Sequence, residues 1–166
     1  MPLGGFPTNQ IDVLNAIKER IKSQVSQLAG ANLVWLSLAD PIPEERQNIF
    51  ATITPLGGTF DEGFFVGTGS ALELAGVQIT VYSANRLDRP DADESMLTDP
   101  TRGLLALKHA LLVALTNWMP TDADSGIGLL ERPMRPTTSG HPGRASEDAG
   151  MFSLNFATDF LWSSSL

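Results

Sequence analysis

The sequence predicts an α+β fold in which two α-helices pack on one face of a mainly antiparallel β-sheet. Two segments repeat apolar residues at helical spacing, and several others alternate apolar and polar residues as half-buried strands do. The predicted elements follow in the order α-β-β-β-α-β-β. The 166 residues are 42% hydrophobic, which is enough for one core. We expect a single domain over residues 1–166, with an N-terminal extension at 1–8 and a mobile loop at 133–150.

The first predicted helix covers residues 11–28. Thr8 or Asn9 can cap its N-terminus, and Asp12 places a carboxylate in the first turn. Gly30 is a natural stop. One stripe of apolar residues recurs at steps of three and four: Ile11, Leu14, Ile17, Ile21, Val25 and Leu28. Such a stripe indicates that the helix covers other elements of the fold.

Three strands are predicted next, at residues 33–38, 49–56 and 72–83. The pair Gly57-Gly58 should break the second strand, so that residues 57–69 form a turn or a short irregular hairpin. Gly76 suggests a bulge or bend within the third strand. That strand alternates, with one apolar side formed by Val77, Ile79 and Val81. It is therefore expected to be buried on one face.

A polar loop at residues 85–98 leads to the second predicted helix. Asp99 is a good N-cap, and Pro100 would occupy the first helical position, where proline is tolerated. Pro120 should end the helix, and Trp118 could extend its apolar face. That face comprises Leu104, Leu105, Leu107, Leu111, Leu112 and Leu115.

The last third of the chain predicts two more strands. Residues 127–132 suggest a short one. Residues 133–150 are rich in Pro, Gly, Ser and Thr, which favours an exposed, mobile loop. The final strand alternates strictly over residues 152–162. Its apolar parity contains Phe152, Leu154, Phe156, Phe160 and Trp162. We expect this strand to bury one face in an antiparallel sheet.

Composition excludes several classes of function. The net charge is −8, with 19 acidic against 11 basic residues, which argues against a general nucleic-acid binder. The chain has no cysteine, so disulfides, thiolate nucleophiles and Cys-based metal sites are excluded. No apolar run reaches the roughly 20 residues that a membrane-spanning helix needs. Residues 1–7 show no targeting pattern, and we expect a soluble chain without a membrane partner.

No motif indicates catalysis. His109 has no second ligand at i±4, and His141 has no local group to orient it as a base. The glycines at 67 and 69 match neither phosphate-binding pattern. We therefore expect no enzyme, no cofactor and no metal. The acidic stretch 88–99 leaves divalent cation binding as an alternative. We prefer an inter-subunit ion-pair loop formed by Arg86, Asp88, Arg89, Asp91, Asp93 and Glu94.

The element order resembles that of tail-terminator (tail-completion) proteins of tailed bacteriophages. The similarity covers residues 9–163 and rests on four segments. These are the amphipathic helix 11–28, the strand 77–83 (VQITVYS), the polar loop before TRGLLALK at 101–108, and the final strand 152–160 (FSLNFATDF). The resemblance implies two helices packed on a sheet, and it carries no catalytic residue.

The resemblance also implies a function. Such a protein forms a ring, usually a hexamer, at the head-proximal end of the tail tube, where it stops tube polymerisation and joins the tail to the head connector or stopper. It implies that loops 85–98 and 133–150 reach neighbouring subunits, and that residues 57–69 face the tube or the lumen. Location in the virion after assembly in the host cytoplasm would follow. Because the acids cluster in loops, we expect some to line the lumen, so that DNA passes without specific binding.

Three alternatives stay open. The chain could be another neck or tail component, namely a head–tail connector, a stopper or a tail-tube protein. It could be a small metal-dependent or acid/base enzyme that uses the acidic stretch 88–99. It could also be a binding module without any role in a virion.

Overall fold

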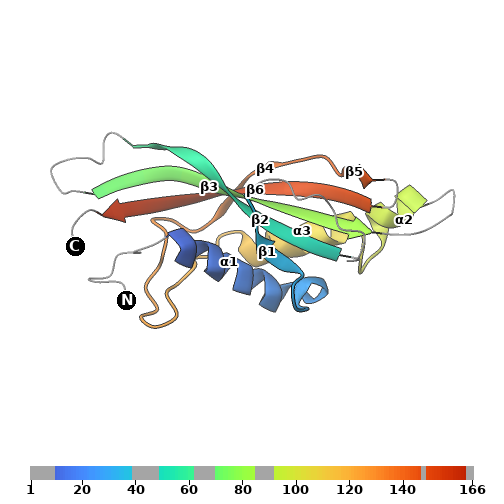
Figure 1. Cartoon of the computed structure of the whole chain (residues 1–166), viewed down its shortest axis with the longest axis horizontal. Helices are drawn as coiled ribbons and strands as arrows, with labels where there is room; N and C mark the ends of the chain where they lie inside the picture. The colour runs from blue at the N-terminus through green and yellow to red at the C-terminus, as the bar shows by residue number, and fades with distance from the viewer. Residues whose placement is uncertain (1–9, 39–48, 62–69, 85–91, 147–148, 164–166) are drawn as a thin grey trace.

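A computed structural model describes residues 10–38, 49–61, 70–84, 92–146 and 149–163. It confirms the α+β class. A six-stranded, mostly antiparallel sheet has the strand order β1-β2-β3-β6-β4, and β5 also pairs with β6. Figure 1 shows the two longer helices side by side on one face of this sheet. The predicted caps Thr8 and Asn9 lie outside the described residues.

The first helix, α1 (Gln10–Gln24), is followed by a 3-10 turn, η2 (Ser26–Leu28). Its predicted stripe is buried from Leu14 to Leu28, but Ile11 is 55% exposed. The helix packs on β1 and β2 and alongside α3. The Arg20 Nε donates to the Ala114 carbonyl at 3.1 Å, and its guanidinium lies over the Trp118 ring, which ties α1 to the end of α3.

The edge of the sheet is formed by β1 (Val34–Leu36), which runs parallel to β2 (Ile49–Phe60). The expected break at Gly57-Gly58 is wrong, because β2 continues through both glycines. A shift in register between Leu56 and Thr59 absorbs the extra residues as a bulge. Gly58 is required there, because a Cβ would lie 2.2 Å from the Leu74 carbonyl oxygen.

The centre of the sheet is one long antiparallel pair. Strand β3 (Ser70–Ala84) pairs with β6 (Ala149–Ser163) in continuous register from Ser70↔Ser163 to Ala84↔Ala149. The alternation predicted for the last strand is confirmed over its described side chains, since Phe152, Leu154, Phe156 and Phe160 are all buried. They face the helices and, with the apolar parity of β3, form the middle of the core.

The second half of the predicted polar loop is a helix, which corrects the sequence-based expectation. Residues 92–98 form α2 (Ala92–Thr98), and α3 (Leu104–Leu115) follows. Asp99 does not cap α3, because Gly103 holds the N-cap position. Its carboxylate instead accepts from the Thr101 and Arg102 backbone N–H groups at 2.8 and 2.9 Å and closes the turn between the helices.

The segment after α3 also differs from the prediction. Residues 127–132 form no strand; a single bridge joins Thr121 and Gly128. The expected mobile loop at 133–150 contains β4 (Arg135–Ser139), β5 (Gly143–Ser146) and the start of β6. Both short strands pair with β6 and extend the sheet at its edge (Figure 1).

Candidate functional site

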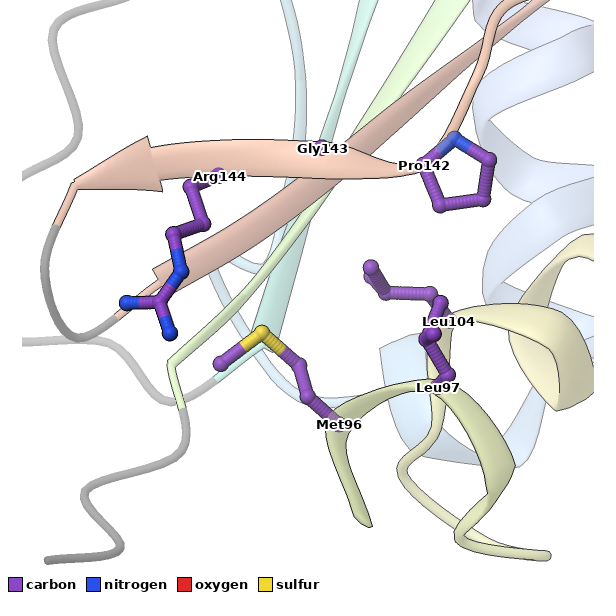
Figure 2. Close-up of a pocket in the computed structure, with 6 residues that line it drawn as sticks. All are labelled: Met96, Leu97, Leu104, Pro142, Gly143 and Arg144. Atoms are coloured by element: carbon purple, nitrogen blue, oxygen red, sulfur yellow. The ribbon is translucent and has the colours of Figure 1, made fainter. Parts of the chain in front are cut away.

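The structure brings together parts of the two segments expected to reach neighbouring subunits. Helix α2, from the 85–98 segment, faces β5, from the 133–150 segment, across an apolar notch of about 180 Å³. Figure 2 shows the side chains that line it. They are Met96, Leu97, Leu104, Pro142, Gly143 and Arg144.

Close packing on β6 sets the depth of this notch. Gly150 lies beneath it, and a Cβ there would stand 2.5 Å from the Met96 sulfur and 2.8 Å from a Leu104 methyl. The missing side chain therefore lets α2 and the start of α3 approach the strand. Met96 and Leu104 are buried, whereas Arg144 is exposed and reaches from β5 toward Met96 (Figure 2). The notch is thus an apolar recess with a cation at its rim.

The six predicted interface residues are only partly placed. Arg86, Asp88, Arg89 and Asp91 lie outside the described residues. Asp93 and Glu94 belong to α2 rather than to a loop, and Glu94 is exposed beside the notch residues of the same helix. The inter-subunit ion-pair loop therefore stays a prediction.

The candidate chemical groups are His109, His141 and the acidic stretch 88–99, of which residues 92–99 are described. Within the described ranges, no group of three or more His, Asp or Glu residues could hold a metal ion. His109 and His141 are both exposed, and neither imidazole makes a hydrogen bond or ion pair with the described part of the chain. Hydrogen bonds from Arg102 and Thr101 hold the pKa of Asp99 below its ordinary value, so this carboxylate has a structural partner.

A second concavity lies on the sheet face opposite the helices and was not predicted. We call it the sheet hollow; its volume is about 450 Å³. Two neighbouring rows of paired residues form it. The first row crosses four strands and contains Leu56, Gly76, Ala157 and Arg135; in the second row, Leu74 pairs with Asp159. Gly76 and Ala157 have no large side chain, so the bottom of the hollow lies close to the backbone. Arg132 and Arg135 lie at its edge.

A buried carboxylate organises the hollow. Asp159 is only 4% exposed, although it alternates with the core residues of β6 and therefore lies on the opposite face of the strand. Its Oδ2 lies 3.4 Å from the Arg132 Nε and 3.2 Å from a terminal nitrogen of Arg135. The two arginine side chains are 57% and 47% exposed. Only the pairing of β6 with β4 could have revealed this cluster, and that pairing is not visible in the sequence.

No helix among the described residues combines the length and apolar character needed to cross a membrane.

Comparison with known proteins defines the fold class. No protein-family model matches the chain, and no curated protein does. Its fold is similar to that of a chain in the virion of a native gene transfer agent particle, with a TM-score of 0.52 and 12% identity over 89% of this chain and 93% of that one. At this identity, the likeness establishes a shared fold. A second solved chain, without a descriptive name, covers 92% of this chain at 13% identity, and its TM-score of 0.48 carries no argument.

Proposed function

We propose that this chain is a structural protein of a virion, and specifically a tail terminator that forms a ring, usually hexameric in such families, at the head-proximal end of a phage tail tube. The observation that carries the proposal is the fold shared with a chain of a gene transfer agent virion over 89% of the present chain. The ring would stop tube polymerisation and join the tail to the head connector or stopper. It would act in the virion after assembly in the host cytoplasm.

Features of the chain itself support assembly rather than catalysis. The notch is a recess lined mainly by apolar side chains. It lies between α2 and β5, which Figure 1 shows at one end of the sheet. Exposed apolar side chains also occur on α3, where Leu105 is 47% and Val113 68% exposed. Recesses and apolar surfaces of this kind are typical of protein–protein contacts.

The direct test is the mass and shape of the purified full-length protein. We expect a closed ring in electron micrographs and an oligomeric mass by light scattering, together with capping of tail-tube polymers. A chain that stays monomeric at all concentrations and never binds tube protein would refute the proposal. A ring located elsewhere in the particle neck would assign the chain to a connector, stopper or tube role instead.

A matched pair of variants tests the notch. Pro142→Lys places a charge in the apolar recess, whereas His141→Lys changes an exposed neighbour that does not line it. We expect Pro142→Lys to weaken ring formation at least about tenfold, because a buried unpaired charge opposes association. His141→Lys should assemble like the wild type. Equal assembly by both variants would exclude the notch from the subunit contact.

The metal-dependent enzyme remains the second candidate function, and it makes a different prediction. If the acidic stretch 88–99 held Ca²⁺ or Mg²⁺, the melting temperature would rise with the ion and fall with a chelator, because a ligand that binds only the folded state stabilises it. The ring proposal expects neither shift.

A further inference from the structure

We propose that the sheet hollow of each subunit receives the turn at residues 121–128 of a neighbouring copy of this chain. The inference rests on the proposed ring function and deepens it by naming both sides of one subunit contact. Its basis is a match of charge and apolar surface between two parts of the molecule that lie on opposite faces.

The hollow provides positive charge next to apolar surface. Asp159 contributes one carboxylate between two guanidinium groups, which leaves one positive charge in excess at the rim. Leu56 and Leu74 line the other side, and Leu74 is 40% exposed. In a chain with a net charge of −8, the positive edge of the hollow attracts a carboxylate, and its leucines favour an apolar side chain next to that carboxylate.

The turn provides both groups. Asp124 and Ile127 are exposed, and Ile127 is 44% exposed. The Asp124 carboxylate makes no ion pair or hydrogen bond with the described residues. The two residues belong to the same short turn, and in the proposed contact both side chains enter the hollow. A volume of about 450 Å³ can hold both side chains.

The turn is held in shape by its own hydrogen bonds. The Asp122 N–H donates to the Ile127 carbonyl at 2.8 Å, and the Gly126 N–H donates to the Asp122 carbonyl at 2.9 Å. The Asp122 carboxylate accepts from the Ser125 hydroxyl at 2.7 Å, and this bond lowers the pKa of Asp122. Gly126, at φ +69, supplies the left-handed position that closes the loop. Little conformational freedom is therefore lost on docking.

The turn and the hollow of one subunit cannot meet each other. The turn lies beside α1, where Asp122 and Thr121 share a surface depression with Asp12 and Glu19. The hollow lies on the other face of the sheet, and Figure 1 shows the loop extending past α1, away from the sheet. The contact must therefore join two different patches of two copies. Contacts of this head-to-tail kind generate closed rings or open filaments.

Charge reversal tests the contact. Asp124→Lys reverses the charge on the turn, and Arg132→Glu reverses the net charge of the hollow. The double variant reverses both charges. Lys22→Glu is the control, because it makes the same charge change as Arg132→Glu at a surface site that lines neither the hollow nor the depression beside the turn. Light scattering over a range of concentrations, at about 0.1 M salt, measures the concentration for half-assembly, and electron micrographs show whether rings close.

We expect each single reversal to raise the half-assembly concentration at least about tenfold and the double variant to recover most of that loss. Ile127→Ser should weaken assembly by a factor that does not change with salt, whereas the factor lost in Asp124→Lys should shrink in high salt, because salt screens the charge contact. Melting curves verify folding. If Arg132→Glu fails to fold beside the buried Asp159, Arg132→Gln and Asp124→Asn replace the two reversals, and their combination should lose less than the sum of the two single losses.

The outcomes separate this contact from the function on which it rests. Rings that form equally well in the wild type, both reversals and the control would refute the contact and leave the ring function intact. Loss in both single variants without recovery in the double variant would also refute it, because the two patches would then face other partners. A wild-type protein that never self-assembles would refute the ring and the contact together.

Discussion

The Thr52 hydroxyl is buried without a hydrogen-bond partner among the described residues. Thr52 lies in β2, pairs with Thr80 of β3, and has 0% of its surface exposed. Valine has nearly the same shape, and it also favours strands. The substitution Thr52→Val replaces the unpaired hydroxyl with a methyl group, and it should therefore stabilise the protein.

The size of the effect follows from the desolvation of one hydroxyl. An unsatisfied buried polar group costs about 1–3 kcal/mol, and we expect Thr52→Val to recover about 1 kcal/mol. For a chain of this size, that corresponds to a rise in melting temperature of roughly 2–4 °C. Thermal unfolding at one fixed protein concentration measures it, since assembly also shifts the midpoint.

Ser83→Ala is the matched control. Ser83 is equally buried in β3, but its hydroxyl donates to the Arg102 carbonyl at 3.2 Å. Its removal should destabilise the protein by about 1 kcal/mol. A lower melting temperature for Thr52→Val would refute the reasoning, because it would mean that the hydroxyl contributes a favourable interaction in the folded state.

Two further predictions concern the turn between α2 and α3. Gly103→Ala should destabilise the protein by about 2 kcal/mol, because the new Cβ would lie 2.5 Å from the Asp99 carbonyl oxygen, whereas Gly57→Ala, which meets nothing within 4 Å, should have little effect on thermal unfolding. Asp99→Ala should destabilise the protein most near neutral pH. Because hydrogen bonds from Arg102 and Thr101 lower the folded-state pKa of Asp99, its stabilisation is complete above the ordinary Asp pKa and is lost as pH falls through the lowered one. Melting temperatures of both proteins from pH 7 down to about pH 2 should therefore converge, and a constant difference would contradict this assignment.

The sequence pattern predicted those elements in which buried residues recur at the regular spacing of a strand or a helix. The alternation in β6 is visible because Phe152, Leu154 and Phe156 all face the helices. The stripe of α1 is visible for the same reason. Ile11 is the exception: it lies in the first turn of α1 and is 55% exposed, and the helical period alone does not show where burial along a helix begins.

Pairing between distant segments accounts for the failures. Strand β4 is exposed along its whole length, and its sequence RPTTS shows no apolar parity. It is a strand because β6 offers it hydrogen-bonding groups at the sheet edge. Gly57-Gly58 similarly stays in β2 because β3 runs alongside and a bulge absorbs the glycines. The sheet hollow needs four strands in register, so no local window of sequence could have revealed it.

The long pairing of β3 with β6 has a consequence for how the chain folds. The two strands are separated in sequence by α2, α3, β4 and β5, so the centre of the sheet cannot close until the last strand has been synthesised. Loop-closure entropy must be overcome before these contacts form, which makes folding slow. Until then, β3 presents an unpaired edge along its 15 residues. Crowded assembly sites would favour wrong strand pairing at that edge, so the yield of assembled protein would depend on how fast the final strand arrives.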